Sequence, residues 1–78
     1  MPFMEIKTRD ELMELKKGDL VVLVFANHQG VDACIVINNN ENDIEVKKLK
    51  DDSSCVMFKE FILTAFSFIK EIYVHRED

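Results

Sequence analysis

Two histidines and two cysteines are the residues of this chain best suited to holding a metal ion. They occur in the order His28, Cys34, Cys55 and His75. Structural zinc sites usually draw their ligands in close pairs, such as two cysteines separated by only about two to four residues. No close pair exists in this order, so the spacing predicts no metal site, and no motif indicates another cofactor.

Cys34 is the residue to consider as a nucleophile. A reactive cysteine needs a nearby base and a positively charged setting that favours the thiolate. Asp32 lies on the same face of the strand expected around it, and a neighbouring carboxylate raises a thiol pKa. Ser53 and Ser54 lack the glycine frame of a nucleophile elbow, and the two glycines are too far apart for a phosphate-binding loop. We therefore expect a protein that is not an enzyme.

The composition describes one folded domain spanning residues 1–78. The chain has 78 residues, of which 47% are hydrophobic and six are Phe. It contains only two Gly and one Pro, which argues against disorder and against a loop-rich scaffold. A chain of this length buries only about 60–65% of the surface that it exposes when unfolded, so its core must be economical.

The charge balance is acidic, with a formal net charge of −5 from fifteen acids and ten bases. Nucleic-acid binders normally collect Lys and Arg, because neutralising phosphates supplies most of their affinity. The acidic total therefore argues against a nucleic-acid partner. It favours a basic protein partner or a protein that imitates nucleic acid, although net charge also simply keeps small proteins soluble.

Four acids in expected loops, Glu41, Asp43, Asp51 and Asp52, are the first candidates for a protein-binding patch. The leading hypothesis is a small acidic module that binds and modulates or inhibits a larger macromolecular partner. A specific version is a phage or mobile-element inhibitor that presents acids to a host nucleic-acid enzyme where phosphates would lie. The alternative is a nucleic-acid-binding module that uses its sheet face, which requires a local basic patch and salt-sensitive binding.

The N-terminal half carries clear element signals. A short strand is expected over residues 3–7, followed by a helix that begins with a capping box of Thr8 and Glu11. Leu12, Met13 and Leu15 would form its inner face, and Gly18 would close it. Three strands are then expected over residues 20–26, 31–37 and 44–50, the first apolar on both faces and the third near an edge. Short polar loops between them favour an antiparallel meander.

The C-terminal third has apolar residues at three- and four-residue spacing, which predicts an amphipathic helix. The residues of this stripe are Phe58, Phe61, Ile62, Ala65, Phe66, Ile69 and Tyr73. We expect a helix from Cys55 to about residue 70, with residues 72–74 either helical or a last strand. The fold class predicted is α+β: three to four antiparallel strands, a short N-terminal helix and a long C-terminal helix packed on the sheet. The alternative is a small SH3-like β-barrel, because Lys17-Gly18-Asp19 leads into an apolar strand as is common there.

The aromatic stripe has two interpretations, a hydrophobic core or a surface that stacks bases. Base-stacking surfaces normally carry flanking Arg, and only Arg9 and Arg76 are present, so the core is favoured. Leu63 and Phe68 fall outside the stripe, and one helix cannot cover both faces of the sheet. A homodimer is one way to cover the remaining apolar surface.

The first third of the chain resembles the opening of thioredoxin-like domains. The resemblance rests on a strand, a capped helix and a Gly18-Asp19 step into an apolar strand that ends at Phe25 and Ala26. That family places a redox cysteine pair directly after this strand. Residues 27–32 contain no cysteine, and the following helix is replaced by an Ile-rich strand and an Asn-rich loop, so the resemblance carries no redox activity to this chain.

The cellular location expected is the cytoplasm. The N-terminus has no basic start or apolar run typical of a signal peptide, and two reduced thiols fit that compartment. The longest apolar run, Leu20 to Ala26, is far shorter than a membrane span, so no membrane association is expected.

Overall fold

The computed structural model describes residues 2–64 and 67–76. They form a six-stranded antiparallel sheet with one short α-helix and one 3-10 turn. The elements are, in chain order, β1 (Phe3–Glu5), α1 (Arg9–Met13), β2 (Leu20–Phe25), β3 (Val31–Asn39), β4 (Asp43–Lys48), β5 (Ser54–Phe58), η1 (Lys59–Phe61) and β6 (Ile69–His75). The strand order across the sheet is β1-β6-β2-β3-β4-β5.

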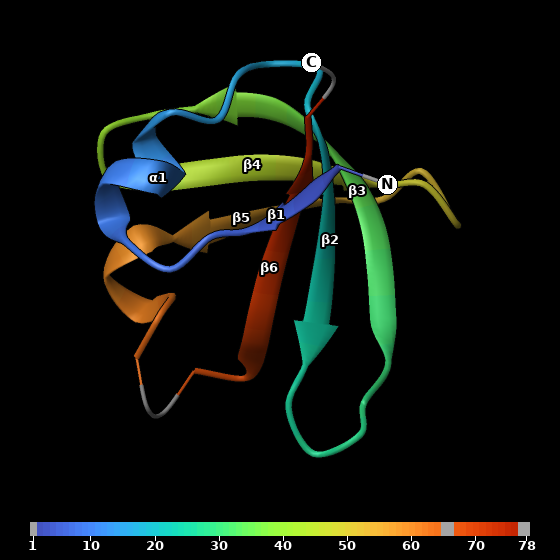
Figure 1. Ribbon diagram of the computed structural model, residues 1–78. Coiled ribbons are helices and arrows are strands. Elements are labelled where there is room, and N and C mark those ends of the chain that lie inside the picture. Colours follow the sequence, from blue (N-terminus) through green and yellow to red (C-terminus); the bar gives the residue numbers. More distant parts are fainter. Residues whose placement is uncertain (1, 65–66, 77–78) are drawn as a thin grey trace.

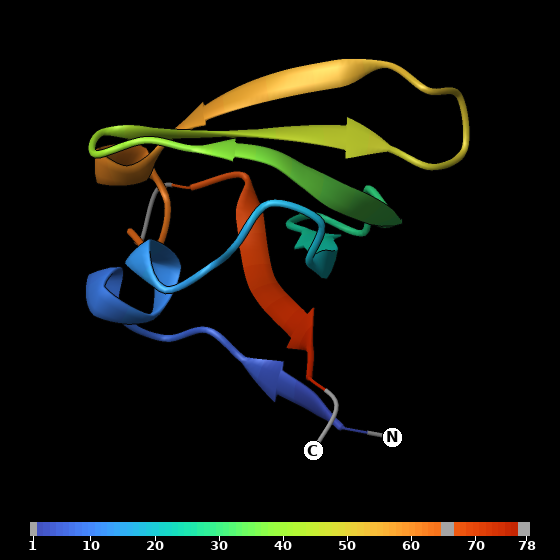
Figure 2. The same ribbon diagram turned by 90° about the horizontal axis from the view of Figure 1, so that it is seen from above.

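The sheet bends over on itself so that two layers of strands face each other (Figures 1 and 2). In Figure 2, β3, β4 and β5 form the upper layer, β6 and β1 lie below them, and α1 sits beside the space between. Strand pairing is irregular between Val24 and Phe25 and again between Val36 and Asn38. Such irregularities bend a strand and increase its twist, which helps to fold the sheet around its own core.

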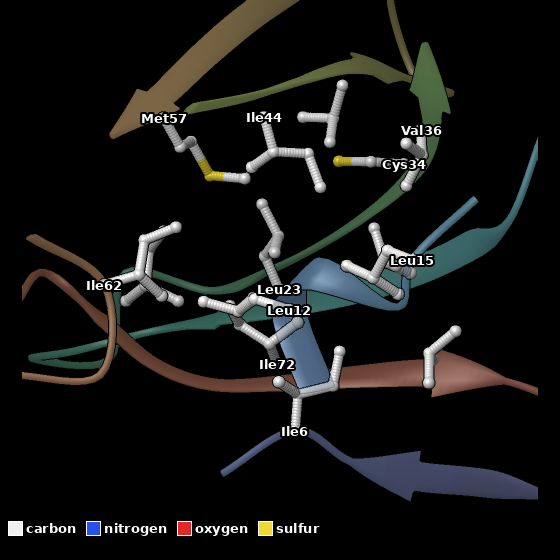
Figure 3. Close-up of a cluster of buried hydrophobic side chains, with 14 residues drawn as sticks. Ile6, Leu12, Leu15, Leu23, Cys34, Val36, Ile44, Met57, Ile62 and Ile72 are labelled. Carbon is white, nitrogen blue, oxygen red and sulfur yellow. The ribbon is translucent and has the colours of Figure 1, made fainter. Parts of the chain in front are cut away.

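The core fills the space between the layers (Figure 3). Strand residues at alternate positions point inward, because successive side chains of a strand face opposite sides. The fourteen core residues are Ile6, Leu12, Leu15, Val21, Leu23, Cys34, Val36, Ile44, Val46, Met57, Ile62, Ile69, Ile72 and Val74. Within the described residues, no helix is long and apolar enough to cross a membrane.

The N-terminal predictions are largely confirmed. The capping box is present: the Thr8 hydroxyl accepts the Glu11 amide at 3.2 Å, and the Glu11 carboxylate accepts the Thr8 amide at 3.1 Å. Gly18 has a φ of +95°, which suits a residue without a side chain. The helix is shorter than expected and ends at Met13, whose side chain is exposed, while Leu12 and Leu15 are buried.

The predicted long C-terminal helix is wrong. Residues 54–58 form β5, η1 follows, and residues 69–75 form β6, which inserts between β1 and β2. Strand β2 is apolar on both faces and pairs with a neighbour along each edge, since β3 lies on one side and β6 on the other. A helix would have left one edge of β2 without backbone partners. Ala65 and Phe66 of the predicted stripe lie outside the described residues.

The α+β prediction is therefore replaced by an almost entirely antiparallel β structure. The barrel alternative is nearer, since the turn at Lys17-Gly18-Asp19 leads into β2 and the sheet curves around one core. The strand predicted to lie near an edge is also better described now. Strand β4 is internal to the sheet, with Ile44 and Val46 buried. The core face of β3 carries Asp32, Cys34 and Val36.

Candidate functional site

The four acids predicted to form a binding patch lie at opposite ends of β4. Glu41 lies in the turn that enters β4 and Asp43 is the first residue of β4, whereas Asp51 and Asp52 belong to the turn that leaves it. Since each residue of a strand advances the chain by about 3.3 Å, the length of β4 separates the two pairs. The structure brings each pair together but does not bring all four into one patch.

Three of these acids take part in local turn contacts. The Asp43 carboxylate accepts a hydrogen bond from the Asn40 side-chain amide at 2.7 Å. The Asp51 carboxylate accepts from the Ser53 hydroxyl at 2.6 Å and from the Ser53 amide at 3.0 Å, and these bonds lower the Asp51 pKa. Asp52 lies 3.5 Å from the Lys47 ammonium. These contacts stabilise the turns and leave the carboxylates at the surface.

A larger exposed feature lies next to β5 and was not predicted from the sequence. Four apolar side chains, Val56, Phe58, Phe61 and Phe68, are 51%, 52%, 64% and 69% exposed. They come from β5, η1 and the residue before β6. The rings of Phe58 and Phe61 are arranged edge to face with centroids 6.5 Å apart. We call these four residues the aromatic edge.

The aromatic edge surrounds an apolar hollow of about 140 Å³. Its walls are β5 on one side and residues 61, 62 and 67–69 on the other, and the lining residues are Cys55, Val56, Met57, Phe58, Phe61, Ile62, Ser67, Phe68 and Ile69. The hollow is about the size of a few methylene groups or one aromatic ring. An apolar side chain from another molecule would fit it better than water would.

The backbone of β5 is available for pairing along its outer side. In the described part of the chain, β5 is the last strand of the sheet. Hydrogen bonds from Lys48 to Ser53 at 2.7 Å and from Lys59 to Asn42 at 2.9 Å bracket its pairing with β4. Antiparallel pairs alternate between bonded and non-bonded positions. The amides and carbonyls of Ser54, Val56 and Phe58 therefore point away from β4, towards the open edge.

Lys59 holds the end of this surface in place. Its side chain is buried, and its ammonium donates to the Asn40 carbonyl and contacts the Met13 sulfur at 3.0 Å. Burial and the nearby charge of Arg9 lower the Lys59 pKa. This lysine ties η1 to the β3–β4 turn and to α1, so the aromatic edge is attached to the rigid part of the fold.

The cysteines are both free. Cys34 is fully buried, and burial together with the Asp32 charge raises its pKa to about 11. Its thiol is therefore protonated at neutral pH, a poor state for a nucleophile. Among residues 2–64 and 67–76, no three His, Cys, Asp or Glu side chains are grouped as metal ligands.

The nucleic-acid alternative requires a local basic patch, but several of the basic residues that could form one are paired with carboxylates. Lys48 and Lys50 both lie against Asp32, with ammonium–carboxylate distances of 3.7 Å and 3.2 Å. Arg76 pairs with Asp19 at 2.9 Å. The parallel pair of Phe25 and Phe68, with ring centroids 6.1 Å apart, lies close to Asp32 and Lys48. Aromatic and basic residues therefore meet there, although the Asp32 carboxylate compensates part of the charge of the two lysines.

Comparisons with known proteins add no relative: no family model, no curated protein and no solved structure matches this chain.

Proposed function

We propose that this chain is a protein-binding module that recognises its partner through the aromatic edge and modulates that partner by occupying its surface. The observation that carries the proposal is the grouping of three exposed phenylalanines around an apolar hollow beside an open strand edge. The proposal assigns no catalytic step to the chain.

The size of the exposed apolar surface supports this proposal. From their exposed fractions, the rings of Phe58, Phe61 and Phe68 leave about 370 Å² in water, if a full aromatic side chain presents about 200 Å². A contiguous apolar patch of a few hundred Å² is typical of an interaction site on a small protein. Aromatic residues are also enriched among the residues that dominate binding energy.

The acidic turns complement this surface as a charged rim. Because β5 runs alongside β4, the turns with Glu41 and Asp43 and with Asp51 and Asp52 lie near the two ends of β5. Rim charges mainly steer association and select partners, so a partner with basic residues around an apolar contact fits best. The net charge of −5 makes a nucleic-acid enzyme, whose surface is basic where it binds phosphates, a specific candidate partner. An inhibitor encoded by a phage or mobile element is one form of this proposal.

The test is affinity capture from a lysate of the native host with three tagged proteins. These are the wild type, Phe61→Ser, and the control Leu49→Ser, which removes another exposed apolar side chain, from the β4–β5 turn (51% exposed, against 64% for Phe61). We expect one stoichiometric protein to be retained by the wild type and by Leu49→Ser but lost by Phe61→Ser. Equal capture by all three would refute the assignment of the aromatic edge. Capture of nucleic acid alone, reversed by moderate salt, would instead support the nucleic-acid alternative.

A further inference from the structure

We propose that a second copy of this chain occupies the aromatic edge, joined by antiparallel pairing of β5 with β5 into one continuous sheet. This inference rests on the proposed function in one respect: it requires the aromatic edge to be a protein interface. It goes further by naming a second copy of the chain, which covers this surface while the other protein is not bound, and by naming the register in which it pairs.

The open edge of β5 has the hydrogen-bonding pattern that self-pairing needs. Ser54, Val56 and Phe58 direct their amides and carbonyls outward, as shown by the bonds that bracket β5 on its other side. A two-fold axis through Val56 places Val56 opposite Val56 of the second copy, and each then donates to the other. This register overlaps all five residues of β5. It sets Ser54 opposite Phe58 of the second copy, so a small side chain faces a large one.

The same axis brings the two apolar hollows together. The two-fold axis runs perpendicular to the joined sheet, so the cores of both copies lie on the same face of that sheet. The two hollows then face each other across the β5–β5 junction. Phe61 and Phe68 of each copy, 64% and 69% exposed, then lie near the hollow of the other. A neighbouring strand alone would cover the backbone edge but would leave these rings in water.

The area available fits a weak but specific dimer. The three rings of both copies together present roughly 700 Å², and the paired strand edges bring the buried total to about 1,000 Å², the lower limit for a specific interface. Buried area alone does not set affinity, but interfaces at this lower limit are typical of weak association, so the test covers the micromolar range.

Strand β5 also lacks the features that normally prevent such pairing. Natural edge strands are usually short or carry Lys, Pro or a bulge. The sequence of β5 is Ser-Cys-Val-Met-Phe, and its register with β4 is regular. The opposite edge, β1, is different, since it has only three residues and directly follows Pro2. The protection is present at one edge of the sheet and missing at the other, as expected if β5 is normally paired.

The charges at the junction give the dimer a recognisable salt dependence. Antiparallel pairing brings the acidic turn of Asp51 and Asp52 in one copy close to Glu60 of the second copy, and each chain carries a net charge of −5. These like charges oppose association, and salt screens them. Self-association should therefore strengthen as salt is added, whereas a basic peptide or a nucleic acid would bind more weakly.

The first test is sedimentation equilibrium of the full chain across the micromolar range at low and moderate salt. Val56→Pro removes the outward amide, which has no role in pairing with β4, and proline is tolerated at strand edges. Val56→Ala keeps that amide and serves as the matched control. We expect the wild type and Val56→Ala to dimerise, more tightly at moderate salt, and Val56→Pro to weaken dimerisation by at least about tenfold. Circular dichroism confirms that each variant is folded.

The second test fixes the register by oxidation of introduced cysteines. Val56→Cys places two thiols directly opposite each other, within the separation that a disulfide bridges. Ser54→Cys places them about 13 Å apart along the strands. We expect a covalent dimer from Val56→Cys and none from Ser54→Cys or the wild type, which contains Cys34 and Cys55.

The outcomes separate this inference from the proposed function. A wild type that stays monomeric, or a dimer that is unaffected by Val56→Pro, would overturn β5 self-pairing. Weakening of the dimer by salt would overturn it as well. The proposed function would still stand in each case if capture of another protein depended on Phe61, and it would fall if capture did not.

Discussion

Asn39, in the polar stretch that the sequence marks as a loop, is expected to be one of the most important polar residues for stability. It ends β3, and its side-chain amide donates to the carbonyls of Leu12 at 3.0 Å and Leu15 at 2.7 Å. The last carbonyls of a helix have no partner within the helix. Asn39 therefore caps the end of α1 and attaches it to the sheet.

The effect of Asn39→Ala follows from these two bonds. Each hydrogen bond contributes a net of about 1 kcal/mol. The Leu12 carbonyl keeps the Leu15 amide as a donor at 3.3 Å, and the substitution also removes the buried Asn39 Oδ1, which has no partner in the described residues. We therefore expect the free energy of unfolding to fall by about 1–2 kcal/mol, which for a domain of this size corresponds to a decrease in Tm of roughly 4–16 °C.

The neighbouring Asn38 provides a matched control. Its side-chain amide donates to Glu45 at 3.0 Å on the exposed face of the sheet, where such a bond adds little. Asn38→Ala should lower the free energy of unfolding by less than about 0.5 kcal/mol. Urea unfolding monitored by circular dichroism measures both variants under the same conditions. Equal effects of the two substitutions would refute the capping role of Asn39.

Two further predictions concern the core. Val74 is fully buried in β6, opposite Val21, whereas Val31 is 62% exposed. Val74→Ala should therefore lower the free energy of unfolding by about 2 kcal/mol, and Val31→Ala by less than about 0.5 kcal/mol. Equal small losses in urea unfolding would contradict the placement of β6. Because burial raises the Cys34 pKa from 9.0 to about 11, the folded chain keeps this proton while the unfolded chain releases it, so stability should fall as pH rises from about 9 to 11. Cys34→Ala should show a shallower decrease in urea titrations over that range, and an unchanged slope would count against the raised pKa.

The N-terminal half was predictable because its signals are local. The capping box needs only Thr8 and Glu11, and the closing turn needs only the positive φ of Gly18. Strands β2 and β3 are marked by apolar runs bounded by turn residues, which are typical of short antiparallel connections. The sequence also predicted a raised pKa for Cys34 from its neighbour Asp32. The pKa is raised, but burial is the larger cause and the Asp32 charge the second.

The C-terminal third was predicted wrongly because the same residues fit two periodicities. Ile69 and Ile72 are three residues apart, as on a helix face, but Ile72 and Val74 are two apart, as on a strand face, and all three are buried. The segment is rich in β-branched and aromatic residues, which strands favour. What decides between the periods is non-local: β2, far away in the chain, needs a second neighbour, and β6 is the strand that pairs with it.

This error also concealed the candidate site. While Phe58 and Phe61 are assigned to one face of a helix, a core explains their hydrophobicity, and only Leu63 and Phe68 remain on that segment to suggest a partner. In the sheet, Met57 and Ile62 enter the core, while Phe58 and Phe61 remain 52% and 64% exposed. The strand that removes these rings from the core also presents its outward amides beside them. The exposure of these rings beside an open strand edge is therefore a consequence of the strand order, and only the strand order distinguishes it from a buried aromatic stripe.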